Sequence, residues 1–373
     1  MKILAIETSC DETAVALLNI NGALEKPDIK VLGNTLLSQV ALHEQYGGVY
    51  PNLAKREHEK NLPPLLEQTL KEAVINDPQL TTDDIDIIAV TNGPGLEPAL
   101  WVGINFAVEL GKKWNKPVIP VNHMEGHLVS VLFRDENAKI KNQNEKLELP
   151  ALGLLVSGGH TELVHIKDFG NYEIIGRTRD DAVGEAFDKT ARMLGLPYPG
   201  GPEISRLAEK ARKRSANDKI KLPRPMIHSK NLDFSFSGLK TAVLYRLKLE
   251  KRVNNEFKED MARAFEDAAV EVLIEKTRKA LFELGDKIKT LIVAGGVSAN
   301  AHLSQELEKL MGKFSNIVLR MPTKLLTIDN AIMIGIAAFI KIKKTPETLK
   351  EKTPIIASGN LSFTPSKLIW VKL

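Results

Sequence analysis

Two short apolar runs near the start of the chain, residues 2–7 and 14–20, predict a pair of strands joined by a polar turn. A charged, periodic stretch over 54–74 predicts a helix. The apolar run 85–90 then predicts a buried strand that ends in a glycine-rich loop. Strand ends of this kind commonly carry ligands in α/β folds.

The second half of the chain repeats this opening. Apolar runs at 151–156 and 162–166 flank a second glycine turn, and helical stretches then alternate with a strand at 289–294. Such alternation is typical of an α/β layered fold, and the repeated opening indicates a duplicated architecture. We expect an N-terminal lobe over 1–133, a linker or insertion over 134–149, a C-terminal lobe over 150–335 and a C-terminal segment over 336–373 that packs back on the first lobe.

Composition places few further limits on the chain. It has 373 residues, of which 43% are hydrophobic, and this length is compatible with about two domains. Cys10 is the single cysteine, which excludes an internal disulfide, and the apolar run 331–340 is shorter than the ~20 residues of a membrane span. With no secretion signal visible, the cytoplasm is the expected location.

The net charge of +4 is too small to indicate nucleic-acid binding by itself. Basic residues do gather in two places, where they form either solvated faces or phosphate contacts. The clusters comprise Lys210, Arg212, Lys213, Arg214, Lys219, Lys221 and Arg224, and then Lys341, Lys343 and Lys344.

Three polar or glycine-rich turns follow predicted strands, at 7–13, 156–161 and 294–300. Glycine permits close approach of a ligand to the backbone, and a helix N-terminus after such a turn favours an anion. Each turn alone is equally compatible with an ordinary polar turn. Together they favour a nucleotide held between two lobes.

His123 and His127 are spaced i, i+4 on a predicted helix, so both imidazoles project from one face. This geometry favours a metal site, although two polar helix residues would give the same spacing. Asp329, before the last predicted helix, is a candidate third ligand, and two histidines with one carboxylate suit iron, zinc or manganese. Met124 stands where a zinc protease has its glutamate, which disfavours peptidase chemistry.

Two further positions remain open between a structural and a ligand-binding role. The carboxylate of Asp188 could accept hydrogen bonds from ribose hydroxyls or could be a solvated or lysine-paired acid. Gly201 could allow a ligand to approach the backbone or could simply belong to a turn that starts a helix.

Ten motifs in order make the chain similar to the TsaD family, the bacterial relatives of the Kae subunit, within the actin, Hsp70 and sugar-kinase superfamily. The resemblance is nearly full length. The motifs are ETSCDET at 7–13, YGGVYPNLAKREH at 46–58, NGPG at 92–95, NHMEGH at 122–127, LLVSGGHTELV at 154–164, DDAVGEAFDK at 180–189, PYPGGPEI at 197–204, FSFSGLKTA at 234–242, AGGVSAN at 294–300 and IDNA at 328–331.

The resemblance implies an actin-like, two-lobed duplicated fold with nucleotide and metal in the cleft between the lobes. It implies one divalent metal per subunit, with iron(II) expected and zinc as the alternative, bound by His123, His127 and Asp329. The adenylate would contact Leu155, Val156, Ser157, Gly158, Gly159, Asp188, Gly201 and Asn300. The sequence departs from the family pattern at Thr327-Ile328 and at Leu96-Glu97-Pro98.

The implied activity is transfer of threonylcarbamate from threonylcarbamoyl-AMP to N6 of adenosine 37 in tRNAs that read codons beginning with A. We expect Asp11 or Glu12 to handle the proton. TsaB-like and TsaE-like proteins are the expected partners, and no membrane is involved. Two other readings are an ATP-dependent small-molecule kinase of the same superfamily, which should not need the histidine pair, and a nucleotide-gated binding or chaperone module.

Overall fold

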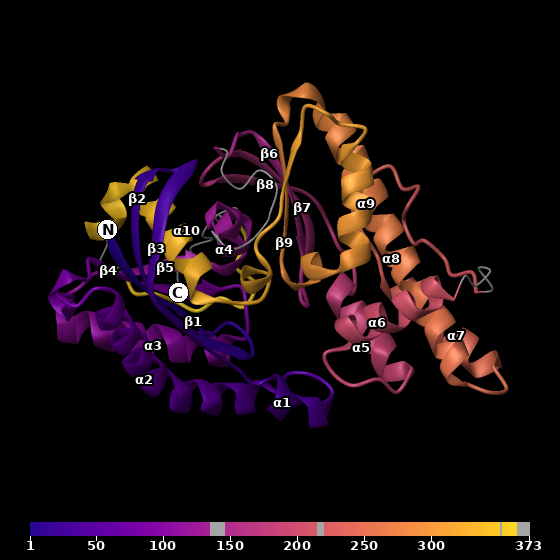
Figure 1. Ribbon diagram of the computed structural model, residues 1–373, viewed down its shortest axis with the longest axis horizontal. Helices are drawn as coiled ribbons and strands as arrows, with labels where there is room; N and C mark the ends of the chain where they lie inside the picture. The colour runs from indigo at the N-terminus through magenta and orange to yellow at the C-terminus, as the bar shows by residue number, and fades with distance from the viewer. Residues whose placement is uncertain (135–145, 215–219, 351–352, 364–373) are drawn as a thin grey trace, which may run out of the picture.

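Two lobes lie side by side in the computed structural model, each built around one twisted sheet (Figure 1). The structure describes residues 1–134, 146–214, 220–350 and 353–363. Most of the predicted linker, residues 135–145, therefore lies outside the described residues, as does Lys219 of the first basic cluster.

The first sheet has the strand order β3-β2-β1-β4-β5. β1 and β2 pair antiparallel with Glu7 opposite Ala14, which confirms the predicted hairpin. β4 and β5 run parallel to β1, so the carboxyl ends of these three strands meet at one edge of the sheet. The bounds are β1 Lys2–Glu7, β2 Glu12–Ala23, β3 Lys26–Ser38, β4 Ile87–Gly93 and β5 Val118–Asn122.

The second sheet repeats this topology with the order β10-β9-β6-β7-β8. β6, β7 and β8 are antiparallel, while β9 and β10 run parallel to β6. The two-lobed, duplicated α/β fold is thereby confirmed. The bounds are β6 Ala151–Val156, β7 Thr161–Asp168, β8 Asn171–Arg177, β9 Thr290–Ala294 and β10 Val318–Arg320.

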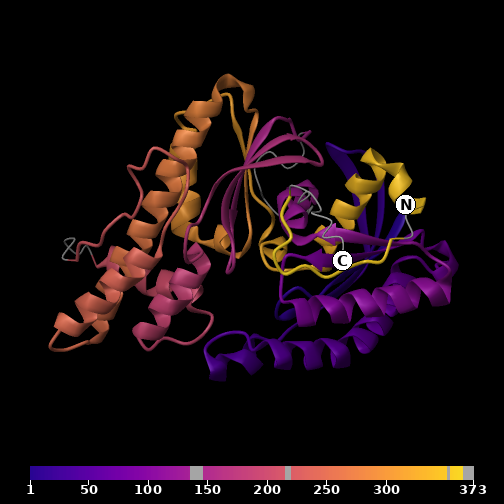
Figure 2. The ribbon, with the colours of Figure 1, turned by 180° about the vertical axis from the view of Figure 1, so that it is seen from behind.

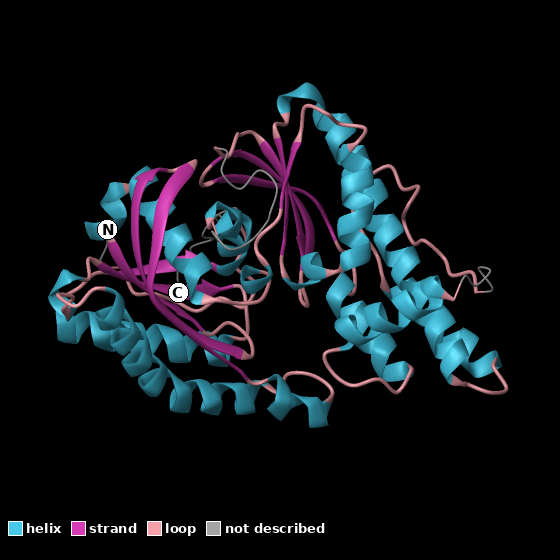
Figure 3. Ribbon diagram, in the orientation of Figure 1, coloured by secondary structure: helices cyan, strands magenta, loops and turns pink. Residues whose placement is uncertain are grey.

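The helices cover the outer faces of both sheets and fill the space between them (Figure 3). α2 and α3 pack on the outer face of the first sheet, and α5 to α9 lie on the outer side of the second. The bounds are α1 Val40–His43, α2 Pro51–Asn76, α3 Glu97–Trp114, α4 His123–Val129, α5 Val183–Met193, α6 Gly200–Lys213, α7 Ser237–Leu249, α8 Asn255–Leu284, α9 Ala301–Met311 and α10 Ala331–Lys344.

α4 and α10 form a central layer between the two sheets. Alternation along β1 produces this arrangement, because Leu4 packs toward α2 and α3 whereas Ile3 packs toward α10. The two central helices approach closely at Gly126, where an added Cβ would lie 3.1 Å from the Met333 side chain. Any group carried by α4 is therefore held against the start of α10.

The segment after α10 runs across the first lobe (Figure 2). The Ser358 amide donates to the carbonyl oxygen of Asn92 at 2.9 Å, and the Gly359 amide donates to Oε1 of Glu97 at 3.2 Å. Pro98 lies in the first turn of α3, where its missing N–H costs no helical hydrogen bond. Among the described helices, none is long and apolar enough to cross a membrane.

Candidate functional site

The structure brings His123, His127 and Asp329 together in the central layer. Nε2 of His123 lies 3.2 Å, and Nε2 of His127 3.1 Å, from Oδ1 of Asp329. α4 begins where β5 ends, and Asp329 immediately precedes the Asn330 cap of α10. Ligand atoms of all three residues lie within 4.8 Å of one another, so they can bind one cation.

Opposite charges govern the electrostatics of this cluster. Burial raises the pKa of the Asp329 carboxyl, but the neighbouring His123 and His127 lower it well below its usual range. Burial lowers the pKa of His123, but Asp329 and Glu7 raise it above the ordinary value. His160 borders the cluster and stays neutral, because burial and the charge of His123 lower its pKa to about 4.

The donor set fits a divalent transition metal. Two imidazoles and one carboxylate are ligands suited to iron, zinc or manganese, and three protein ligands leave positions open for a substrate. Nδ1 of His127 is buried and has no hydrogen-bond partner among the described residues. Among these residues, the hydrogen bond of this ring is therefore the one between Nε2 and Asp329. The Asp329 side chain remains 21% exposed, which keeps one side of the cluster accessible.

Asp11 ends the turn after β1 and Glu12 begins β2, where Glu12 interacts electrostatically with Asp329. Burial and then the charge of Asp11 raise the pKa of Glu12 to about 9, with a further contribution from Asp329. Oε1 of Glu12 accepts a hydrogen bond from Oγ of Ser38 at 3.0 Å. A raised pKa favours the protonated form of Glu12 at neutral pH.

The glycine loop after β6 leaves open space above its backbone. A Cβ added at Gly158 or Gly159 would meet no atom within 4 Å. Ser157 closes the turn, since its amide donates to the carbonyl oxygen of His160 at 2.9 Å and its Oγ accepts from the His160 amide at 3.1 Å. Leu155 and Val156 before it are fully buried in β6 and can offer a ligand only backbone groups.

Asp188 on α5 lies against the start of α6, where Gly200 and Gly201 are the first two residues. Oδ1 of Asp188 accepts the Gly200 amide at 2.7 Å, and burial raises the pKa of this carboxyl. A Cβ at Gly201 would meet no atom within 4 Å. Asp188 also lines a cavity of about 530 Å³ that opens between residues 44–47 and residues 195–198, a volume typical of small-molecule sites.

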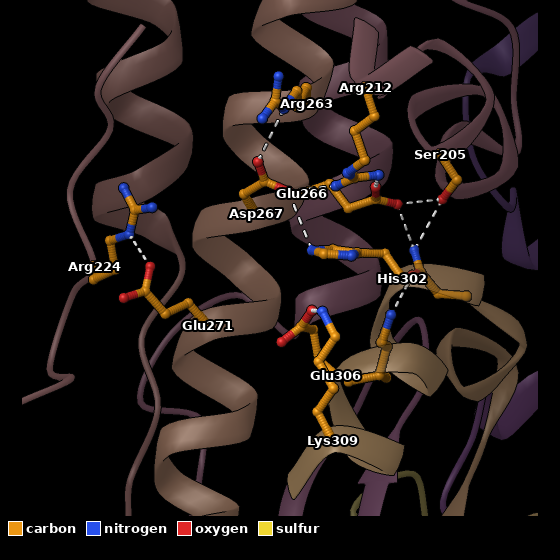
Figure 4. Close-up of polar contacts among 12 residues, drawn as sticks. Ser205, Arg212, Arg224, Arg263, Glu266, Asp267, Glu271, His302, Glu306 and Lys309 are labelled. Carbon is orange, nitrogen blue, oxygen red and sulfur yellow. Dashed lines mark hydrogen bonds and ion pairs between the residues drawn. The ribbon is translucent and has the colours of Figure 1, made fainter. Parts of the chain in front are cut away.

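The side chain of Asn300 is engaged by the protein itself. Its Nδ2 donates to Oγ of Ser205 at 2.9 Å and to Oε1 of Glu266 at 2.7 Å, while its Oδ1 accepts the Leu303 amide at 2.9 Å. Figure 4 shows Ser205 and Arg212 both directed at Glu266. A nucleotide contact through Nδ2 would have to displace one of these bonds.

The arginines of the first basic cluster bind α8. Arg212 pairs with Glu266 at 2.6 Å, Arg214 pairs with Glu259, and Arg224 pairs with Glu271 at 2.7 Å. Their charges are therefore largely neutralised within the lobe. This arrangement favours a structural role over the phosphate contacts that the clustering left open.

Comparison with known proteins identifies the family. The sequence profile of TsaD, described as tRNA N6-adenosine threonylcarbamoyltransferase, matches residues 30–336. The chain belongs to the TsaD family. A protein of this description from Burkholderia ambifaria is 45% identical over 353 residues, which cover 93% of this chain and 94% of the relative. One from Chromobacterium violaceum is 47% identical over 347 residues, 92% of this chain and 94% of the relative.

Solved structures support the fold of this TsaD chain. HypF from T. kodakarensis superposes with a TM-score of 0.58 at 14% identity. The alignment covers 94% of the TsaD chain but only 49% of HypF, so the chain spans about half the length of that protein. At this identity the likeness concerns the fold alone.

Two residues that contact the cluster or the turn after β1 were not singled out from the sequence. Glu7 ends β1 and contacts His123, and an acid directly after a buried apolar run is the signal that could have indicated it. His58 on α2 holds the turn after β1, with Nδ1 2.8 Å from Oγ1 of Thr13 and Nε2 3.0 Å from the carbonyl oxygen of Cys10. His58 lies 48 positions from Cys10, so no local sequence pattern indicates this contact.

Proposed function

We propose that this chain transfers a threonylcarbamoyl group from threonylcarbamoyl-AMP to N6 of adenosine 37 in tRNAs that read codons beginning with A. The observation that carries the proposal is the cluster of His123, His127 and Asp329 in a chain that matches the TsaD family over residues 30–336. The open backbone at Gly158, Gly159 and Gly201 supports a bound adenylate.

The reaction is an acyl transfer with AMP as the leaving group. The N6 amine attacks the acyl carbon, a C–N bond forms, the bond from that carbon to the phosphate oxygen breaks, and one N6 proton is released. The amine is a weak nucleophile because its lone pair is delocalised into the ring, so positioning supplies much of the assistance. No covalent intermediate with the protein is required.

The residues of the two lobes divide the work of binding. The backbone amides of Gly158 and Gly159 would hold the phosphate, with Asp188 at the ribose. His123, His127 and Asp329 would hold a divalent cation, iron(II) or alternatively zinc, which supplies Lewis-acid polarisation of the acyl oxygen.

Asp11 and Glu12 would accept and hold the proton that N6 releases. Burial and the charge of Asp11 raise the pKa of Glu12 to about 9, so in this proposal Asp11 would accept the proton from N6. Glu12 would then stabilise the turn by hydrogen bonding within the pair. Replacement of Asp11 by Asn should therefore slow transfer without weakening adenylate binding.

Partners complete the proposal. We infer that TsaB-like and TsaE-like proteins assemble with the chain and that the reaction takes place in the cytoplasm, where tRNA is available. The described arginines of the first basic cluster are ion-paired, so a partner surface that adds contacts to the tRNA backbone fits the charge distribution.

The direct test is transfer of labelled threonylcarbamate from threonylcarbamoyl-AMP to tRNA in the presence of the partner proteins. Wild type should label a tRNA with adenosine 37 and not one with guanosine there, and His123→Ala should lose about 100-fold or more in rate. His165→Ala is the matched control, because His165 on β7 interacts electrostatically with Lys167, Glu173 and Lys287 rather than with the site.

Transfer that proceeds equally well in His123→Ala would contradict the role of the cluster. If wild type gave no transfer and instead phosphorylated a small metabolite with ATP, the kinase reading would replace this proposal.

A further inference from the structure

Glu7 is a fully buried carboxylate behind the histidine cluster. Its Oε1 accepts the Ser9 amide at 2.5 Å, and its Oε2 accepts Oγ1 of Thr91 at 2.5 Å. The same Oε2 lies 3.0 Å from Nδ1 of His123. A carboxylate that accepts hydrogen bonds at both oxygens is fixed in position, and it presents an acceptor to the ring nitrogen.

The strand topology builds this contact. β1 and β4 run parallel with Ile6 beside Val90, so Glu7 and Thr91 follow side by side at the end of the two strands. α4 begins at the end of β5, the next strand in the sheet, and this places His123 over the same edge. The carboxylate is therefore held by the sheet and the imidazole by the helix.

We propose that Glu7 is a positioning residue that prepares His123 for metal binding, an inference that rests on the proposed metal centre. An acceptor at Nδ1 keeps a proton on that nitrogen, so Nε2 is the ring nitrogen that would release its proton and bind a cation shared with Asp329 and His127. Metal-bound histidines commonly donate their second ring N–H to a carboxylate in this manner, which fixes the tautomer and raises the basicity of the ligand nitrogen.

The two histidines of the cluster differ in this respect. Nδ1 of His123 lies against Glu7, with Oγ of Ser9 at 3.2 Å, whereas Nδ1 of His127 has no partner among the described residues. Of the two histidines, His123 therefore has its second ring nitrogen held by the carboxylate of Glu7. Loss of that contact should weaken the whole site.

The test measures Zn²⁺ affinity of the purified full-length chain by competition with a fluorescent chelator. In Glu7→Gln the amide places its NH₂ group against either the Ser9 N–H or Nδ1 of His123, positions where the native residue has an acceptor. We expect Zn²⁺ to bind about 10- to 100-fold more weakly. At saturating Co²⁺, the visible absorption bands should also shift, because His123 changes orientation.

Glu125→Gln is the matched control. Glu125 lies on α4 between the two histidines, but its Oε1 accepts from the hydroxyl of Tyr172 at 2.8 Å, away from the cluster. This variant should bind Zn²⁺ within about twofold of wild type. Thr91→Val, which removes one donor to Glu7, should lower the affinity about three- to tenfold and provides a second test if Glu7→Gln does not fold.

Circular dichroism of the metal-free proteins separates misfolding from loss of the ligand geometry. A folded Glu7→Gln with wild-type Zn²⁺ affinity and an unshifted Co²⁺ spectrum would overturn the inference, as would an equal loss in Glu125→Gln. If wild type itself bound Zn²⁺ no better than His123→Ala, the metal centre of the proposed function would fail instead.

Discussion

Glycines within the second lobe serve different purposes although they look alike in the sequence. Gly159 and Gly201 have no protein atom within 4 Å of where a Cβ would be, so a side chain there would project into the proposed ligand space. At Gly184, a Cβ would lie 2.5 Å from the carbonyl oxygen of Ser157. The first kind of position is compatible with binding, and the second is required for packing.

This difference predicts opposite effects of one substitution. Gly159→Val should change the free energy of unfolding by less than about 1 kcal/mol and weaken AMP binding at least about tenfold, because the added side chain occupies ligand space. Gly184→Val should instead lower the free energy of unfolding by about 2 kcal/mol or more. Urea unfolding and calorimetric titration with AMP measure the two effects. Unchanged AMP affinity in Gly159→Val would place the nucleotide elsewhere.

At the scale of elements, α6 and α8 are joined by an ion pair whose carboxylate is buried and whose Arg212 side chain is 26% exposed. Glu266 on α8 is 1% exposed and pairs with Arg212 of α6. It also accepts hydrogen bonds from Oγ of Ser205 and from the side-chain Nδ2 of Asn300. Removing one partner of a buried pair leaves the other charge without compensation. The contacts of this carboxylate therefore connect the helix packing to a residue expected at the adenylate.

Arg212→Leu should lower the free energy of unfolding by about 3 kcal/mol. Arg206→Leu on the same helix is the control, because Arg206 pairs with Glu203 at the surface and such pairs contribute less than about 1 kcal/mol. Chemical denaturation of both variants measures the difference. Equal losses would mean that burial of Glu266 does not control the stability of this helix pair.

The elements differ in how readily their sequences reveal them. β1 and β6 are continuous apolar runs, because both faces of each are covered by helices, and these runs predict strands directly. β3 was not predicted. It begins with Lys26 and Pro27, contains Gly33 and is half exposed at the sheet edge, so neither composition nor alternation indicates a strand.

At the scale of the whole molecule, local spacing predicted the histidine pair but could not predict what stands behind it. His123 and His127 are neighbours through one helical turn, which a sequence records. Glu7 reaches His123 across 116 positions through the order of three strands, and no spacing rule encodes that contact. In the first basic cluster, the clustering was visible in the sequence but the acidic partners were not. Those partners lie on α8, 45 or more positions away.

The stability of the whole chain should fall in mild acid. Burial lowers the pKa of His58, so the folded state binds a proton at this ring less readily than the unfolded chain does. Stability is therefore complete above the unfolded value of about 6.5 and is lost as pH falls below it. Urea unfolding between pH 8 and pH 5 measures this loss, which should be smaller in His58→Gln. The same slope in both proteins would exclude His58 as its source.

The two corresponding turns of the duplicated fold have diverged in chemistry. The turn after β1 carries carboxylates and adjoins the imidazoles, whereas the turn after β6 carries bare glycine amides. The phosphate end and the acyl end of the proposed substrate would therefore contact turns of different chemistry. In the proposed function, only one orientation of threonylcarbamoyl-AMP would match both turns, with its phosphate at the glycine turn and its acyl group at the carboxylate turn.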